Sequence, residues 1–154
     1  MSGVLNDLQT AALTIMQGDK YYARVALLTE QLGDIRNQIQ ISLGKLGICA
    51  IIMTPSAECK LTNCPGPILD PLKLSVDIVE LVVTNRGANG SKQPASEVAE
   101  HTAWLLHYPN HAHHRKDPCI FTARSIRQVP DKLFLVYRVE FTTSGSLSGL
   151  TQET

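Results

Sequence analysis

The sequence predicts one α+β domain, in which helices pack on one face of a mixed, mostly antiparallel sheet of about five strands. Three observations support this fold class. The stretch from Leu72 to Asn85 is the longest strand-like run in the chain. Residues 120–129 and 133–142 flank a turn at Pro130 and have the alternation of a β-hairpin. Helical patterns separate the other strand-like segments, so the expected order is α-β-α-β-β-α-β-β.

The size and charge of the chain limit its class. Its 154 residues are enough for one domain, which we place at residues 1–142, with a flexible Ser/Gly/Thr-rich tail at residues 143–154. Fourteen basic residues balance fourteen acidic ones, so there is no net field to hold nucleic acid or an anionic membrane. Apolar runs stay short of the roughly 20 residues of a membrane span, and the N-terminus has no signal-peptide pattern. We therefore expect a cytoplasmic product whose four cysteines are thiols.

The first third of the chain predicts two helices and two strands. Residues 3–17 carry an apolar stripe at helical spacing, and residues 24–29 are typical of a short strand. Asp34 is a suitable N-cap for a second amphipathic helix, which Gly47 ends. Ile48–Thr54 is wholly apolar, as expected for a strand buried on both faces.

The longest strand contains a change of parity. The apolar residues of its two halves are Leu72, Leu74, Val76 and Ile78, followed by Val79, Leu81 and Val83. A one-residue shift exchanges the two faces of a strand, so we expect either a β-bulge at Ile78–Val79 or a far half buried on both faces. Under both interpretations this strand is central, and Val76 and Leu81 belong to the core.

Three polar connections stand out. Pro55–Pro71 is long for a loop in a compact domain, so we expect it to be functional or exposed. Arg86–Gln93 is a soft loop that leads into a helix at residues 94–107, and residues 109–118 form a second polar loop. Gly87 and Gly90 are too close together for a phosphate-binding loop of the G-x-x-x-x-G-K-[ST] type.

A metal site would need two of these loops to meet. Cys59 and Cys64 lie in the first long loop, and His111, His113 and His114 lie in the second polar loop. Structural zinc sites favour tighter paired spacings than C-x4-C. We therefore interpret these residues as solvated loop side chains, and we assign no metal and no cofactor.

The remaining reactive side chains do not form a catalytic group. Cys49 in an apolar strand and Cys119 at a strand start are typical packing residues. The carboxylates of Asp34, Glu80, Glu97 and Glu100 suggest no acid–base pair and are interpreted as helix-surface groups. The aromatic residues Trp104, Tyr108, Tyr21 and Tyr22 are interpreted as core or interface anchors. We predict that the protein is not an enzyme.

Four segments taken together resemble a known family. They are Tyr21–Glu30, Leu46–Pro55, Val79–Gly87 and Ala95–Glu100. The order and the residue sequences of these segments resemble those of small neck and tail-completion proteins of long-tailed bacteriophages. Within that group they are most similar to the tail terminators. The resemblance spans roughly residues 13–142 and includes no catalytic motif.

The resemblance implies a structural role in the virion. Such proteins close into a homomeric ring, usually a hexamer, at the head-proximal end of the tail tube. There they stop tube polymerisation and meet the head connector, while genomic DNA passes through the ring without specific binding. We expect one or both of the two loops to order against an adjacent subunit or the tail tube, through Arg86, Asn89, Lys92, Leu61, Ile68 and Leu69. The alternative is that the first loop is mobile and the second folds back on its own core. Two alternatives stay open: another head–tail joining, tube or baseplate component, and a small cytoplasmic metal- or ligand-binding protein.

Overall fold

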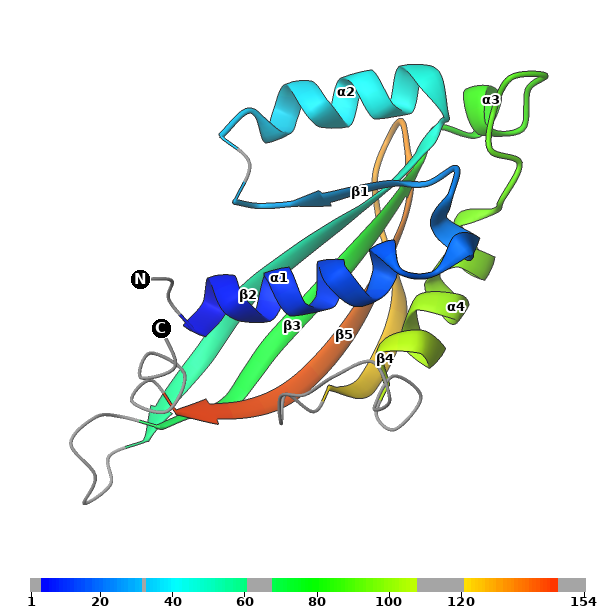
Figure 1. The fold of residues 1–154 in the computed structure, drawn as a ribbon. Coiled ribbons are helices and arrows are strands. Elements are labelled where there is room, and N and C mark those ends of the chain that lie inside the picture. Colours follow the sequence, from blue (N-terminus) through cyan, green and yellow to red (C-terminus); the bar gives the residue numbers. More distant parts are fainter. Residues whose placement is uncertain (1–3, 32, 61–67, 108–120, 147–154) are drawn as a thin grey trace.

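The computed structural model describes residues 4–31, 33–60, 68–107 and 121–146 (Figure 1). Its elements are α1 (Val4–Gln17), the 3-10 turn η1 (Lys20–Tyr22), β1 (Ala26–Thr29), α2 (Ile35–Lys45), β2 (Ile48–Lys60), β3 (Ile68–Glu80), α3 (Val82–Asn85), α4 (Ala95–Leu106), β4 (Thr122–Val129) and β5 (Leu135–Ser146). The predicted order of helices and strands is confirmed, with the single turn α3 added between β3 and α4. Among the described residues, none of the helices has the length and hydropathy needed to cross a bilayer.

The strands form one five-stranded sheet in the order β1-β2-β3-β5-β4. β1 pairs with β2 in parallel, and the other three pairs are antiparallel. The predicted α+β class with a mixed, mostly antiparallel sheet is therefore confirmed. β3 lies between β2 and β5, so the prediction that the longest apolar run supplies the central strand is also confirmed.

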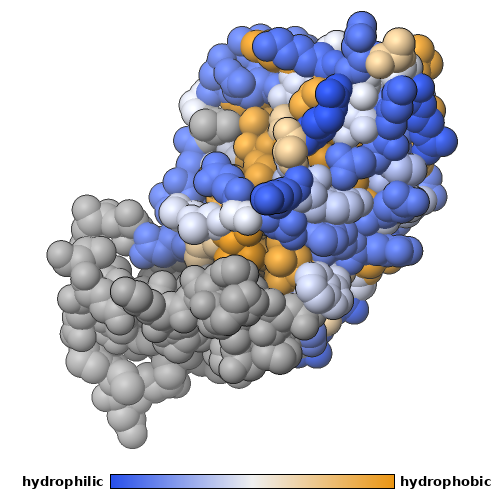
Figure 2. All heavy atoms as spheres, turned by 45° about the vertical axis from the view of Figure 1, so that its right-hand side comes forward, coloured by the Kyte–Doolittle hydropathy of each residue, from blue (hydrophilic) through white to orange (hydrophobic). Residues whose placement is uncertain are grey.

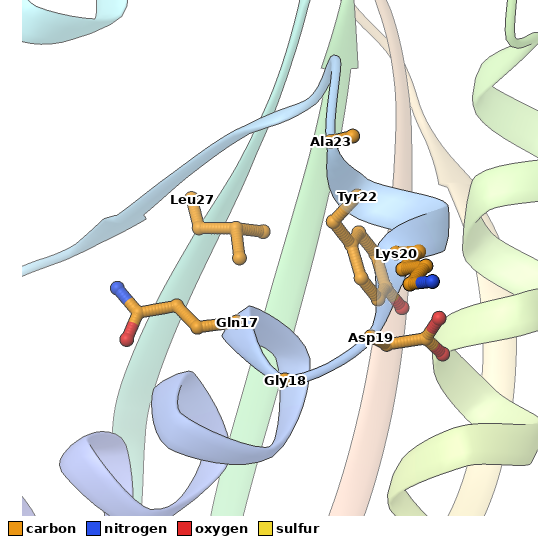
Figure 3. Close-up of a pocket in the computed structure, with 7 residues that line it drawn as sticks. All are labelled: Gln17, Gly18, Asp19, Lys20, Tyr22, Ala23 and Leu27. Carbon is orange, nitrogen blue, oxygen red and sulfur yellow. The ribbon is translucent and has the colours of Figure 1, made fainter.

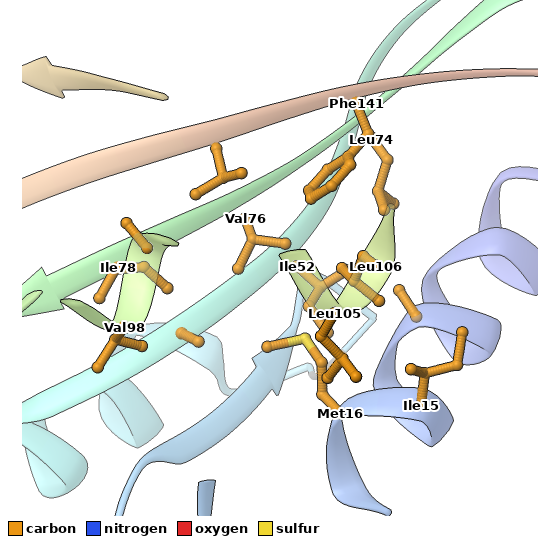
Figure 4. Close-up of a cluster of buried hydrophobic side chains, with 14 of the residues drawn as sticks. Ile15, Met16, Ile52, Leu74, Val76, Ile78, Val98, Leu105, Leu106 and Phe141 are labelled. Carbon is orange, nitrogen blue, oxygen red and sulfur yellow. The ribbon is translucent and has the colours of Figure 1, made fainter. Parts of the chain in front are cut away.

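The helices do not all cover the same face of the sheet. α1 and α4 pack against alternate residues of β2, β3 and β5 to form the main core, which includes Leu74, Val76 and Phe141 (Figure 4). Leu43 of α2 instead joins a smaller cluster with Cys49 and Val79, whose side chains point to the other face of their strands. The expectation of helices on one face is thus not confirmed. α2 connects two parallel strands, and its apolar stripe is satisfied equally well by either face.

The parity change in β3 is explained by burial on both faces. Ile78 pairs with Tyr137 and Val79 with Val136, so the pairing with β5 has no bulge there. Ile78 belongs to the main core and Val79 to the smaller cluster. The predicted strand was too long, because the chain leaves the sheet after Glu80 and turns through α3. Leu81 is consequently only half-buried, not a core residue, and Val83 is 85% exposed.

The predicted loop Pro55–Pro71 is mostly strand. β2 continues to Lys60 and β3 starts at Ile68, and these two residues pair. Both prolines coincide with breaks in the pairing: the register shifts between Met53 and Ser56 in β2, and between Leu69 and Leu72 in β3. Proline has no N–H to donate, so a bulge is the place where a strand tolerates it. The remainder of the loop, residues 61–67, lies outside the described residues.

At the C-terminus, β5 runs to Ser146 and so passes the predicted end of the domain at residue 142. Residues 147–154 of the predicted tail, and the predicted polar loop at residues 109–118, lie outside the described residues.

Candidate functional site

The segment Arg86–Gln93, expected to be a soft loop, is tied to the body of the protein. The backbone N–H of Lys92 donates to the Asn85 carbonyl at 2.8 Å, and that of Ser91 donates to the Leu46 carbonyl at 3.1 Å. The guanidinium of Arg24 donates to the Asn89 carbonyl at 3.0 Å. The side chains of Arg86, Asn89 and Lys92 remain exposed. They are therefore presented to solvent by a fixed backbone.

A buried carboxylate anchors this segment. Glu80 is 0% exposed and accepts hydrogen bonds from the Asn85 amide at 2.8 Å, the Arg86 guanidinium at 3.1 Å and the Ala95 N–H at 3.0 Å. Ala95 is the first residue of α4, so Glu80 also satisfies one of the free N–H groups that open a helix. The interpretation of Glu80 as a surface carboxylate was wrong. It ends a buried strand, and the sequence pattern does not reveal the donors that converge on it.

Two glycines allow the segment to pack closely. Gly47 has a φ of 80°, as its predicted role after a helix requires, and a Cβ there would lie 2.1 Å from the Asn85 nitrogen. A Cβ on Gly90 would lie 2.1 Å from the Thr84 carbonyl oxygen. Side chains at either position would push α3 away from the sheet.

Exposed apolar side chains gather at the same end of the sheet. Glu80 pairs with Leu135, so α3 and the turn before β5 both lie at this end. Val83 is 85% exposed and Leu133 is 78% exposed. On the face seen in Figure 2, hydrophilic side chains otherwise predominate, with narrow hydrophobic patches between them. This end therefore combines exposed apolar and cationic groups.

The sheet face opposite α1 and α4 carries charged side chains on three neighbouring strands. We call it the basic sheet face, and its charged residues are Lys73, Asp77, Arg124, Arg127, Arg138 and Glu140. Arg138 donates two hydrogen bonds to the Asp77 carboxylate, at 2.7 and 2.9 Å. This hydrogen bonding raises the pKa of Arg138 above its ordinary value. Arg127 donates to Glu140 at 2.8 Å. Among the side chains that the structure describes on this face, four are basic and two are acidic, which leaves an excess of positive charge.

A bulge in the edge strand β4 adds to this row. Ala123 pairs with Phe141 and Ser125 with Glu140, so Arg124 is the extra residue. Its guanidinium donates to the Thr142 hydroxyl at 2.8 Å, which places it beside Arg127. Residues 124–128 of β4 are all exposed, whereas residues 74–80 of β3 are all buried. The bulge places Arg124 on the same face of β4 as Arg127, and the sequence prediction did not find this pair.

The outer side of α4 has the opposite charge. We call Glu97, Glu100 and Trp104 the acidic helix face. They recur at helical spacing, and α4 contains neither Lys nor Arg. Glu97 and Glu100 are exposed, and Trp104 is 58% exposed. Trp104 is thus one of the predicted aromatic anchors that reaches the surface, whereas Tyr22 is buried and its hydroxyl lies 2.7 Å from that of Thr102.

An aromatic and ionic cluster joins α4 to the turn after α1. The His101 ring stacks on Tyr21 with centroids 3.9 Å apart, and its Nε2 lies 2.8 Å from the Asp19 carboxylate. The Asp19 carboxylate also accepts from the Tyr21 N–H at 2.9 Å. These contacts fix the orientation of α4, and therefore of its outer side.

A hollow of about 280 Å³ lies beside this cluster, between the end of α1, η1 and β1 (Figure 3). Its lining includes Asp19, whose carboxylate is already bonded to His101 and Tyr21, and the apolar side chain of Leu27. The lining polar groups do not converge on a common point, so we assign no ligand to it.

The predicted metal and nucleophile candidates are placed as follows. Cys59 lies in β2, and Cys64, His111, His113, His114 and Cys119 are outside the described residues. Within the described ranges, no group of three or more His, Cys, Asp or Glu side chains could hold a metal ion. Cys49 is 0% exposed, which confirms it as a packing residue, and burial raises the pKa of its thiol to about 12.

The predicted interface residues do not form one surface. Arg86, Asn89 and Lys92 lie beyond the Glu80 end of β3, whereas Ile68 and Leu69 lie at the opposite end of the same strand. Leu61 is outside the described residues. The structure therefore separates the two predicted loops by the length of the central strand. No protein-family model matches this chain, and no curated protein sequence matches it at a significant level.

Proposed function

We propose that the protein is a virion structural component, a tail terminator that forms a homomeric ring at the head-proximal end of a phage tail tube. In this role it ends tube polymerisation and joins the tail to the head connector. The proposal rests on the sequence resemblance, together with an α+β fold of the kind that the resemblance implies.

The observation that carries the proposal is the pair of unlike surfaces on one rigid sheet. The basic sheet face and the acidic helix face lie on opposite sides of the sheet, because Lys73 and Arg138 point away from the core residues that contact α4. A ring of identical copies needs two different contact surfaces, since each copy meets its two neighbours head to tail. Opposite placement lets one copy meet a neighbour on each side.

The end of the sheet that bears Arg86, Asn89 and Lys92 supplies a third surface. Val83 and Leu133 are exposed at this end, where a partner could cover them. In a ring built through the two sides of the sheet with the strands parallel to the ring axis, this end faces along that axis. We assign it to the tail tube or the head connector.

If the proposal holds, a phage genome encodes the chain, and virions of that phage provide the test. Purified virions should contain the protein at the head–tail junction, which labelled antibody locates by electron microscopy. Particles assembled without it should carry tails of uncontrolled length. Localisation to the baseplate or along the tube would instead favour another virion component, and absence from virions would contradict the proposal.

A further inference from the structure

We propose that the acidic helix face of one copy docks on the basic sheet face of the next copy. The inference rests on the proposed ring and specifies its contact. Its occupant is a second copy of this chain, because both partners of the contact are present on the same molecule and differ in sign. α4 carries Glu97 and Glu100 with no Lys or Arg, whereas basic residues outnumber acidic ones on the sheet face.

The two surfaces also match in length. Glu97 and Trp104 are seven residues apart on a helix, which spans about 10 Å at ~1.5 Å per residue. Arg124 and Arg127 are three residues apart on a strand, which also spans about 10 Å at ~3.3 Å per residue. One helical stripe can therefore lie along the arginines of β4, with Glu97 and Glu100 near one arginine and the Trp104 ring near the other.

The two arginines of β4 are already oriented for such a contact. Arg127 and Arg124 are exposed, yet each is oriented by one hydrogen bond, to Glu140 and to Thr142 respectively. A guanidinium has further N–H donors beyond the one used, so it can accept a second carboxylate without releasing the first. Trp104 adds a ring face on which a guanidinium can stack.

A reciprocal charge exchange tests this contact. The sheet variant carries Arg124→Glu and Arg127→Glu, and the helix variant carries Glu97→Lys and Glu100→Lys. Each variant then has the same sign on both surfaces, so each should lose self-association by at least tenfold in dissociation constant. An equimolar mixture should recover it, because every contact between unlike variants pairs opposite charges. Sedimentation velocity measures both quantities.

The matched control places the same charge change elsewhere. Arg36→Glu with Lys45→Glu alters exposed residues of α2 and should assemble as wild type does. Circular dichroism and melting curves check that each variant folds. If the sheet variant does not fold, Arg124→Gln with Arg127→Gln removes the charge without reversing it and should still weaken assembly.

Trp104 gives an independent readout. It is the only tryptophan of the chain, so its emission should shift to the blue as wild-type protein assembles. Rings that form normally from the sheet variant or the helix variant, or a mixture that fails to recover, would overturn this contact and leave the ring proposal standing. A wild-type chain that stays monomeric would overturn both.

Discussion

At the scale of single residues, Glu80 is the group on which the most contacts depend. It is fully buried, and donors from α3, Arg86 and the first residue of α4 converge on it. The sequence could not show this, because a glutamate at the end of an apolar run fits a solvated strand end equally well. Only the tertiary path of the next fifteen residues, which returns Ala95 to the same carboxylate, buries it.

Glu80→Gln should destabilise the protein by about 1–3 kcal/mol, the cost of leaving a buried donor unsatisfied. The glutamine amide would point a donor either at the Asn85 amide and the Arg86 guanidinium or at the Ala95 N–H, where the carboxylate oxygens now accept. Urea unfolding of the variant measures the change. The control Glu97→Gln alters an exposed carboxylate on α4 and, in protein diluted to the monomer, should unfold as wild type does. Equal midpoints for the Glu80 and Glu97 variants would remove Glu80 as the anchor.

The thiol of Cys49 should be almost inert in the folded protein. Burial raises its pKa to about 12, so the thiolate fraction at pH 8 is about one in ten thousand. With Cys59, Cys64 and Cys119 replaced by serine, alkylation at pH 8 should be ~1000-fold slower in native protein than in denaturant. Labelling at the unfolded rate would show that the strand does not bury this residue.

The same shift predicts the direction of a pH effect on stability. An unfolded thiol loses its proton near its ordinary pKa of 9.0, whereas burial raises the pKa of the folded one to about 12. The contribution of Cys49 is therefore constant below pH 9 and is lost as the pH rises through this window. Replacing Cys49 with Ala should flatten that part of the stability curve, which thermal melts in a pH series can measure.

At the scale of elements, periodicity predicted which segments form helices and strands, but it did not predict where the strands end. Alternation identified the central strand and the terminal hairpin, and helical stripes identified α1, α2 and α4. Strand ends were missed where tertiary contacts decide them: the Leu81 N–H donates to the Gly47 carbonyl at 2.7 Å and starts a turn that apolar composition conceals. Pro55 and Pro71 suggested a loop, but bulges keep both within strands.

The contrast between Leu74 and Leu81 tests the observed end of β3. Leu74 is 0% exposed in the main core, so Leu74→Ala should cost about 2–5 kcal/mol. Leu81 is half-buried beside the smaller cluster, so Leu81→Ala should cost clearly less. Chemical denaturation of the two variants measures both losses in the free energy of unfolding. A larger loss at Leu81 would restore the longer strand that the sequence predicts.

The glycines of the anchored segment provide a matched pair. Gly90→Ala should destabilise the protein, because its Cβ would lie 2.1 Å from the Thr84 carbonyl oxygen. Gly44 in α2 has no atom within 4 Å of its Cβ position, so Gly44→Ala should stabilise by about 0.4–1 kcal/mol. Thermal melting should therefore move in opposite directions. A neutral Gly90→Ala would mean that the segment is as soft as its sequence suggests.

At the scale of the whole molecule, the sequence predicted the fold class and the central strand but not the surfaces. Whether an amphipathic helix lies above or below a sheet leaves no trace in its own apolar stripe, so the position of α2 was not predictable. The basic sheet face combines residues from β3, β4 and β5 that are adjacent only through register. The predicted interface loops, by contrast, were chosen from composition, and the structure separates them.

The central claim is that the chain assembles with copies of itself through two unlike surfaces. The most direct measurement is the mass of the untagged wild-type protein by native mass spectrometry, across a range of concentration and salt. We expect a closed assembly whose mass is about six times that of the 16.9 kDa chain. It should dissociate as the salt concentration is raised, because salt screens the charges across each contact. A single species of 16.9 kDa at every concentration and salt would show that the chain does not assemble with copies of itself.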